Sequence, residues 1–537
     1  MLYSPTLGTS VPVSNEIQRF IDSTTEQVRP LEKAYLLAEW ESAVNGTPEA
    51  LDRTQQAQAA YMRCWSDAER YEAARRYDQQ GNADPVLARQ VRLIYLTAAQ
   101  NQQDEATIGR LTALESEVRG LYTNFRGKVD GRELSDNAMD DILARSDDPE
   151  EVRRVWEASK QVGVQVARQV RELARVRNEA ARRQGFRDHF QRSLTLSEID
   201  EGQLLALFES LEAQSEGPFE RLMESIKQHR SRHFGIDPAD LHPWHYSDRF
   251  FQQVPAMGKL DIDALFAEKD PVPLATATYD GLGMDVRDVL ARSDLYARPG
   301  KNQHAFMTHI DRAGDIRTLN NLERNQRWNE TLHHELGHAV YEKYLDQALP
   351  WLLRAPAHIL STEAIAILMG RLTLNEEWLK HVLGVPGSQA AAVADAAGER
   401  RRASGLIFTR WCLVMTNFER RMYGDPEADL DTIWWDLVER YQKLRLPTGR
   451  RAPDWAAKYH VALAPVYYQN YELGHLVSAQ LLNRITLEAG GFVGRRAAGD
   501  WLKRQFFQPG ARQDWSTHVA GATGEPLNPR HFLDGLN

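Results

Sequence analysis

The chain has 537 residues, of which 42% are hydrophobic and 26% are charged, and this composition is typical of a soluble globular protein with two or more domains. Its net charge of −10 comes from 75 acidic and 65 basic residues that are interspersed, and no basic block indicates a nucleic-acid partner. Only two cysteines are present, Cys64 and Cys412, which excludes a disulfide framework and a zinc site built from cysteines.

The N-terminal segment contains no signal for export. MLYSPTLGTSVPVSNEIQRF has neither the basic region nor the apolar stretch of a secretory signal. No run of about 18 apolar residues is present that could cross a membrane. We therefore expect a cytoplasmic protein that does not span a membrane.

Helical periodicity dominates the first part of the chain. Apolar residues recur three or four positions apart on charged backgrounds in five long segments, namely residues 14–45, 50–80, 84–130, 149–185 and 200–232. Such stripes are typical of helices that pack into a core. No repeat of fixed period and no long low-complexity linker interrupts them.

The pattern changes between about residues 235 and 325. Proline and glycine punctuate the chain there, and the short segments HAFMTHID and DIRTLNN are typical of strands joined by turns. Helices resume at about residue 326. The sequence therefore predicts one mostly α unit with three parts, 1–235, 236–325 and 326–537, and with one small antiparallel sheet beside the helix that begins near residue 326.

That helix carries the motif H-E-x-x-H at His334, Glu335 and His338, within NETLHHELGHAVYEKYL. Residues four apart lie on the same face of a helix, so the two imidazoles converge on one point and suit a tetrahedral zinc ion. Glu335 lies beside them and is placed to take a proton from the attacking water. The motif predicts a zinc hydrolase, most often a metallopeptidase.

A catalytic zinc site needs a third protein ligand. The metzincin pattern fails, because the required glycine and histidine do not follow His338. His358 and Glu363 remain. Glu363 stands in the apolar segment LSTEAIAILMGRL, where a lone carboxylate must be paired or bind a metal. His358, in APAHIL, is expected to support a metal ligand, to lie on the substrate side or simply to be exposed to solvent. The sequence therefore favours Glu363 as the ligand.

With Glu363 placed 25 residues after His338, the chain resembles the angiotensin-converting-enzyme family and the related thimet oligopeptidases and oligoendopeptidases. These are mostly helical zinc peptidases, the gluzincins. The resemblance implies two helical halves that flank a deep substrate cleft, with the N-terminal helices as its lid. It is strongest over about residues 300–480, and RNEAARRQGFRDHF from residue 177 resembles a helix of the family's N-terminal half.

The segment QHAF at residues 303–306 resembles the converting-enzyme segment that precedes the zinc helix. The resemblance implies that His304 and Ala305 lie on an edge strand that pairs with the substrate backbone. Main-chain hydrogen bonds at an exposed sheet edge are a common way to hold an extended peptide.

Two further segments, IWWDLVERYQKLRLP from residue 433 and WAAKYHVALAPVYYQNYELG from residue 455, resemble the family's C-terminal half. The resemblance implies that Lys458 and Tyr468 hold the substrate's C-terminal carboxylate. It also implies that His460 and Tyr471 stabilise the tetrahedral intermediate. One residue must be inserted between His460 and Tyr471 in this comparison, so Tyr467 is a candidate for either tyrosine role.

The chain also departs from the converting enzymes. Val438 and Asn470 stand where those enzymes place chloride-binding arginines, so chloride activation is not expected, and a several-fold rise in rate with added chloride would refute this prediction. Ile367 replaces an aspartate that supports a zinc-bound histidine. Such histidines usually need an outer partner, and the sequence does not name one.

The sequence thus predicts a peptidase that uses one Zn²⁺ ion and cleaves short oligopeptides. Release of C-terminal dipeptides is expected if Lys458 binds a free C-terminus. The alternatives are an oligoendopeptidase or a single-residue metallocarboxypeptidase on the same fold. A non-catalytic peptide-binding protein is the least favoured reading, because Glu335 and all three ligand candidates are present.

Overall fold

The computed structural model describes residues 13–255 and 262–536, which are mostly helical and include two small sheets. The chain divides into two compact units, each formed from three separate stretches. Unit 1 comprises Met1–Gln102, Glu268–Gly370 and Glu488–Gly524, and unit 2 comprises Gln103–Ala267, Arg371–Leu487 and Glu525–Asn537. The substrate cleft expected between two halves stays a prediction.

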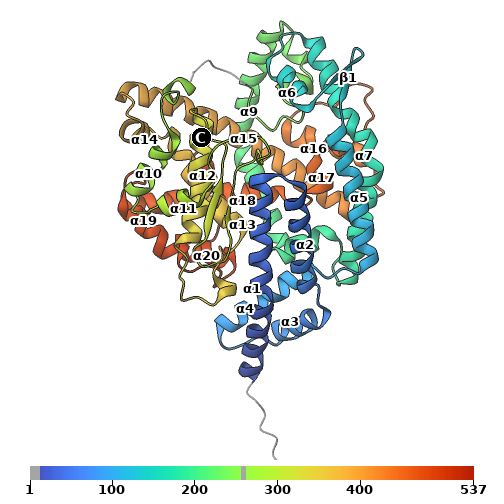
Figure 1. Cartoon of the computed structure of the whole chain (residues 1–537). Helices are drawn as coiled ribbons and strands as arrows, with labels where there is room; N and C mark the ends of the chain where they lie inside the picture. The colour runs from blue at the N-terminus through green and yellow to red at the C-terminus, as the bar shows by residue number, and fades with distance from the viewer. Residues whose placement is uncertain (1–12, 256–261, 537) are drawn as a thin grey trace, which may run out of the picture. The chain divides into compact units, whose positions relative to one another are not determined.

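Unit 1 contains the predicted zinc helix and the sheet beside it (Figure 1). Its helices and strands are α1 (Val13–Asn45), α2 (Pro48–Trp65), α3 (Ala68–Gln80), α4 (Pro85–Gln100), α10 (Pro271–Gly281), α11 (Arg287–Arg292), β3 (Phe306–His309), β4 (Ile316–Leu319), α12 (Gln326–Lys343), α13 (Ile359–Gly370), α19 (Arg496–Leu502) and α20 (Trp515–Thr523).

Unit 2 is built on long helices. Its elements are α5 (Glu105–Asn124), β1 (Gly127–Val129), β2 (Arg132–Leu134), α6 (Asp136–Arg145), α7 (Pro149–Arg183), α8 (His189–Leu196), α9 (Glu201–Phe234), α14 (Glu376–Trp378), α15 (Gly387–Gly424), α16 (Leu430–Gln442), α17 (Tyr459–Leu463), α18 (Tyr468–Ala489, of which the last two residues fall in unit 1) and α21 (Arg530–Asp534).

Two of the long predicted helices are interrupted by capping residues. The segment 50–80 breaks into α2 and α3, because the Asp67 side chain accepts a hydrogen bond from the Arg70 amide and starts a new helix. The segment 84–130 ends its first helix at Gln100, and Asp104 caps α5 in the same way through the Thr107 amide. Apolar periodicity continues across both breaks, so the stripe alone does not reveal them.

The strands predicted from HAFMTHID and DIRTLNN are confirmed as β3 and β4. They pair antiparallel, with Phe306 opposite Leu319 and His309 opposite Ile316. The expected sheet therefore lies beside α12, which packs against both strands. A second antiparallel ladder, β1 with β2, falls partly within the segment predicted as helix up to residue 130.

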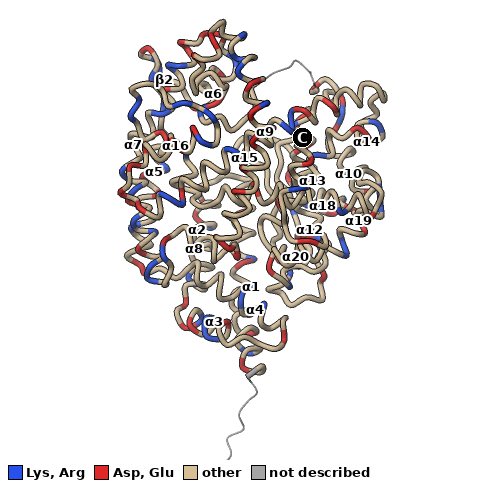
Figure 2. Tube along the Cα trace, turned by 180° about the vertical axis from the view of Figure 1, so that it is seen from behind, with Lys and Arg blue, Asp and Glu red and all other residues tan. Residues whose placement is uncertain are grey.

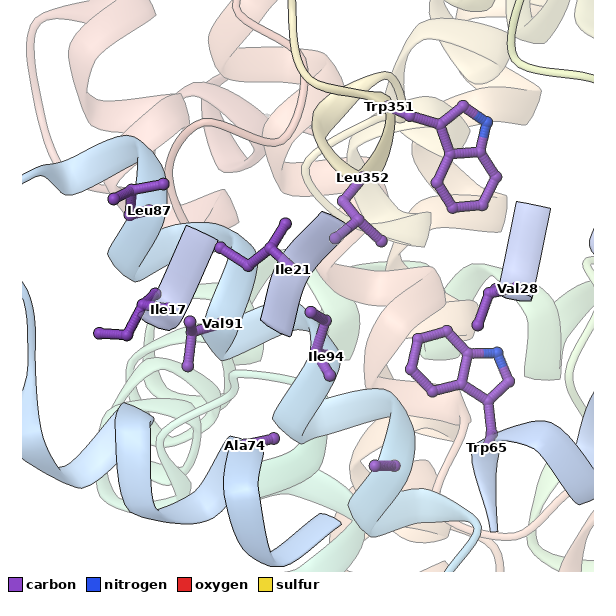
Figure 3. Close-up of a cluster of buried hydrophobic side chains, with 11 residues drawn as sticks. Ile17, Ile21, Val28, Trp65, Ala74, Leu87, Val91, Ile94, Trp351 and Leu352 are labelled. Atoms are coloured by element: carbon purple, nitrogen blue, oxygen red, sulfur yellow. The ribbon is translucent and has the colours of Figure 1, made fainter. Parts of the chain in front are cut away.

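A hydrophobic cluster in unit 1 joins the N-terminal helices to a later segment of the chain (Figure 3). Its buried members are Ile17, Ile21 and Val28 of α1, Trp65 of α2, Ala74 of α3, Leu87, Val91, Ile94 and Ala98 of α4, and Trp351 and Leu352. Burial of each valine, leucine or isoleucine side chain in the cluster contributes roughly 1.5–3 kcal/mol. The cluster fixes α1 and α4 to the segment between α12 and α13.

Acidic and basic residues are interspersed along the trace (Figure 2). Among the described helices, none is long and apolar enough to cross a membrane.

Candidate active site

The zinc helix α12 begins where Asn325 caps it. The Asn325 side chain accepts a hydrogen bond from the Trp328 amide at 2.8 Å. The helix packs along α13 (Figure 1), and Gly337 allows this close approach. A Cβ atom at Gly337 would lie 2.9 Å from the Cα of Ala366, so any larger residue would force the two helices apart.

His333, which directly precedes the motif, and His334 have different surroundings. His333 is fully buried, and its Nδ1 lies 2.8 Å from the Asn329 carbonyl oxygen. The Tyr279 hydroxyl donates to the His333 carbonyl at 2.6 Å. His333 therefore anchors α12 to α10, whereas His334 is partly exposed and faces the predicted site.

The three predicted ligands converge. The Nε2 atoms of His334 and His338 lie 3.3 Å apart, and the Glu363 carboxylate oxygens lie 3.7 Å and 3.6 Å from them. Four ligands at about 2.1 Å from a tetrahedral zinc ion stand ~3.4 Å from one another. The donor atoms and their spacing therefore fit Zn²⁺. His358 is not in this cluster, and its Nδ1 accepts a hydrogen bond from the Leu360 amide at the start of α13.

Both histidines are neutral at pH 7. Burial lowers the pKa of His334 to about 4, and burial together with the neighbouring His334 lowers the pKa of His338 to about 3. A metal ligand must present an unprotonated nitrogen, so neutral imidazoles are ready to bind. Burial raises the pKa of Glu363 to about 7, and a bound dication would favour its ionised form.

Thr362 is the outer partner of His338, which the sequence could not name. Its Oγ1 lies 2.7 Å from His338 Nδ1. Because Nε2 faces the other two ligands, Nδ1 carries the proton and donates a hydrogen bond to the Thr362 hydroxyl. Thr362 precedes Glu363 on α13, so one helix supplies both a ligand and the group that fixes the tautomer of another.

Glu335, the predicted base, is 7% exposed and lies on the wall of the cavity that holds the ligands. Burial, followed by the charge of Glu363, raises the pKa of Glu335 to about 8. A bound dication would oppose this effect.

The cavity beside the ligands has a volume of about 610 Å³. One wall is the segment 305–309, which contains β3, and α1 contributes Glu32, Tyr35 and Leu36. Of the predicted edge residues, Ala305 lines the cavity, and the strand itself begins one residue later at Phe306. His304 is exposed and precedes the strand. Their roles in peptide binding stay predictions.

Paired charged side chains also line this cavity. Glu32 of α1 accepts two hydrogen bonds from Arg312, at 2.6 Å and 2.9 Å, and one from the Tyr61 hydroxyl. His309 Nδ1 donates to Glu342 of α12 at 2.9 Å, while its Nε2 accepts from the Gly314 amide. These pairs connect α1 and the zinc helix to the β3–β4 hairpin.

The remaining predicted residues lie in unit 2. Lys458 is 9% exposed, and its Nζ donates to Gln252 Oε1 at 3.0 Å and lies 5.6 Å from the Tyr468 ring centroid. Burial lowers the pKa of Lys458 to about 8. Within the described ranges, no carboxylate lies within 4.0 Å of Lys458. Gln252, far away in sequence, carried no signal that could have identified it.

The structure brings His460 and the predicted tyrosines together. The ring centroids of His460 and Tyr468 are 4.9 Å apart, those of Tyr468 and Tyr471 are 5.5 Å apart, and those of Tyr467 and Tyr471 are 5.0 Å apart. Burial, followed by Lys458, lowers the pKa of His460 to about 4. His460 Nδ1 is buried without a hydrogen-bond partner among the described residues.

The positions that depart from the converting enzymes have well-defined surroundings. Val438 lines a cavity of about 20 Å³ together with Lys160, whose buried ammonium donates to the Arg249 carbonyl at 2.7 Å. Asn470 is 8% exposed in α18. The expectation that chloride does not activate the protein stays a prediction.

Two family models match the chain, each over a different part. The model described as angiotensin-converting enzyme matches residues 11–225, and the model of peptidase family M3 matches residues 289–537. The second match contains His334, Glu335, His338 and Glu363. No curated protein matches the chain.

These matches add to the sequence interpretation. The sequence resembled the converting enzymes most strongly over residues 300–480, but this region is matched by the model of peptidase family M3. The converting-enzyme model instead matches the N-terminal part, where only the segment from residue 177 had suggested that family. Both families consist of zinc-dependent peptidases. The chain is a zinc metallopeptidase, similar to the angiotensin-converting enzyme family in its N-terminal part and to peptidase family M3 in its C-terminal part.

Proposed function

We propose that this metallopeptidase cleaves short oligopeptides in the cytoplasm and recognises the free C-terminus of its substrate, from which it releases dipeptides. The location rests on the two cysteines, Cys64 and Cys412, which are both free. The release of two residues at a time is proposed from the resemblance to the converting enzymes.

The surroundings of Lys458 are the observation that carries the proposal. A buried ammonium is costly unless an anion or several hydrogen-bond acceptors compensate it. Lys458 has the amide oxygen of Gln252 and the faces of Phe250, Trp411 and Tyr468 around it, and no carboxylate in ion-pair range among the described residues. Asp248 and Asp140 act on this ammonium from beyond ion-pair range, and a substrate carboxylate supplies a direct partner.

The ligand set would hold zinc through His334, His338 and Glu363, and zinc so bound supplies a Lewis acid that polarises the scissile carbonyl and makes water more acidic. Glu335 accepts the proton of the attacking water on its carboxylate and then passes it to the leaving amine. Ala305 and β3 hold the substrate backbone in an extended form along the cavity wall.

Negative charge grows on the carbonyl oxygen as water adds. The Tyr471 hydroxyl and His460 donate hydrogen bonds to this oxygen in the proposed mechanism. A well-placed donor of this kind contributes roughly 3–4 kcal/mol to transition-state stabilisation.

Product analysis tests the cleavage mode. One oligopeptide is digested with a free and with an amidated C-terminus, and the products are identified by mass spectrometry. Dipeptide release from the free acid alone supports the proposal. Single residues would indicate a carboxypeptidase, and equal internal cleavage of both peptides would indicate an oligoendopeptidase. A Lys458→Met variant should lose the preference for the free acid.

Three variants test the assigned chemistry. Glu335→Gln should lose most activity yet retain zinc, whereas His334→Ala should lose the metal, as measured by elemental analysis. Tyr471→Phe should lower kcat by about 10²–10³ with a smaller effect on KM, because its hydroxyl acts mainly in the transition state. Near-normal turnover of the Glu335 or Tyr471 variant would contradict the assignment.

A further inference from the structure

The turn that joins α17 to α18 contains a residue in an unusual conformation. Val466 has a φ of +54°, and it separates the helix that carries His460 from the helix that carries Tyr471. The left-handed region is unfavourable for any residue with a Cβ atom and most unfavourable for a β-branched one. Such a conformation persists only where the surroundings impose it.

Two buried side chains hold Val466 in this conformation. The Val466 amide donates to Glu419 Oε1 at 2.8 Å, and the Val466 carbonyl accepts from Gln469 Nε2 at 2.6 Å. Glu419 is 1% exposed and Gln469 is 2% exposed. The backbone hydrogen-bonding groups of Val466 are thus both satisfied by side chains, one from α15 and one from α18 itself.

The helix on the other side of the turn is held by the same region. Arg177 of α7 is buried and donates to the Ala462 carbonyl of α17 at 2.7 Å and to the Tyr423 hydroxyl of α15 at 3.2 Å. Burial raises the pKa of the Glu419 carboxyl to about 8, and the charge of Arg177 opposes this rise. Helices α7 and α15 therefore support α17 and the following turn together.

We infer that Glu419 is a positioning residue, which holds Val466 in the left-handed conformation and thereby sets the orientation of Tyr471 relative to His460. The inference rests on the roles proposed above for His460 and Tyr471. Glu419 does not touch substrate in this scheme, because its carboxyl is bound to the turn and is closed to solvent.

A rescue experiment tests this role. Glu419→Leu removes the acceptor for the Val466 amide, so the turn should relax and kcat should fall about tenfold or more, with zinc content unchanged and KM little affected. Glu419→Gln keeps a neutral acceptor and should stay within about threefold of the wild type. Glycine adopts a positive φ without a Cβ penalty, so Val466→Gly in the Glu419→Leu background should recover most of the lost kcat.

The outcomes separate this inference from the proposed function. If Tyr471→Phe turns over normally, the proposed role of Tyr471 fails. If Tyr471→Phe is slow but Glu419→Leu is not, or if Val466→Gly does not rescue it, the positioning role is refuted. Should Glu419→Leu not accumulate as folded protein, Gln469→Leu serves instead. It removes the donor to the Val466 carbonyl and should lower kcat about threefold or more without loss of zinc, provided that the conformation of the turn matters for turnover. The role of Glu419 itself is then tested with Glu419→Met, which is close to glutamate in size and lacks the carboxylate acceptor, and an unchanged kcat of that variant would refute the role.

Discussion

Thr362 shows how a single hydroxyl determines the state of a metal ligand. An imidazole can bind zinc through either nitrogen, and the hydrogen bond at the other nitrogen decides which one is free. With Thr362 at Nδ1, His338 presents Nε2 toward His334 and Glu363. The partner is a neutral hydroxyl, so it orients the ring without adding negative charge to it.

Thr362→Val should therefore weaken zinc binding. Valine has nearly the same shape as threonine but accepts no hydrogen bond, and loss of an outer partner typically costs 10–100-fold in metal affinity, that is, about 1.4–2.7 kcal/mol. Competition with a chelator of known affinity measures the change. Thr362→Ser keeps the hydroxyl and is the matched control. Equal zinc affinity of the valine and serine variants would show that Thr362 does not fix the ring.

Lys458 makes the proposed recognition of a C-terminus dependent on pH. Burial lowers its pKa to about 8, an effect that Arg249 reinforces and that Asp248 and Asp140 oppose. The ammonium is about 90% present at pH 7, half present at pH 8 and progressively lost above that value. The kcat/KM for free-acid peptides, relative to that for the amidated peptides, should then fall about tenfold per pH unit. This ratio cancels titrations that affect both substrates, and a ratio that stays constant to pH 10 would contradict the assignment.

At the scale of elements, the site depends on how closely two helices approach. His334 and His338 come from α12, and Glu363 comes from α13, so the spacing of the ligands is the spacing of the helices. Gly337 lies between the two histidines and contacts α13 at Ala366 and Met369. The glycine of the motif is thus a packing residue.

Gly337→Ala should push α13 away from α12 and displace Glu363. Because a Cβ atom would lie 2.9 Å from the Cα of Ala366, a backbone atom must move. We expect weaker zinc binding and a lower unfolding temperature. Gly109→Ala in α5 is the control, since a Cβ atom there meets nothing within 4 Å and should stabilise its helix by roughly 0.5–1 kcal/mol. A Gly337→Ala variant with wild-type zinc affinity would refute this explanation.

The elements also show what the sequence could and could not predict. The ligands were predictable because a spacing of four on one helix and a carboxylate in an apolar segment are local patterns. The strands β3 and β4 followed from turns around short alternating segments. Thr362, Gln252 and Glu419 were not predictable in their roles, because their partners come from tertiary packing. The breaks before α3 and α5 were missed since the apolar stripe continues across the caps at Asp67 and Asp104.

At the scale of the whole molecule, the metal ligands all belong to unit 1, while the cluster of Lys458, His460 and Tyr471 belongs to unit 2. A ligand that binds only the folded state stabilises the structure that contains its site. Zinc should therefore stabilise unit 1 directly.

Removal of zinc by a chelator should lower protection from hydrogen exchange in α12 and α13, but much less in α15 and α16 of unit 2. The free energy of unfolding of unit 1 should fall by about 2.7 kcal/mol if free zinc was present at a hundred times its dissociation constant. Exchange measured by mass spectrometry resolves these segments, and the His334→Ala protein should resemble the chelated wild type. Uniform loss of protection over both units would show that they unfold together.

Unit 1 is formed from three separate stretches of the chain, the last of which is 488–524, and this order determines when the metal site can be completed during synthesis. Tyr341 of α12 stacks on Phe507 with ring centroids 4.9 Å apart, and Arg89 of α4 donates to the Ala511 carbonyl at 3.0 Å. The ribosome makes all three ligands by residue 363, yet Tyr341, one turn beyond His338 on α12, lacks its partner Phe507 until the segment 488–524 has emerged. A nascent chain that stops before residue 488 should thus carry every zinc ligand and still fail to hold the metal firmly.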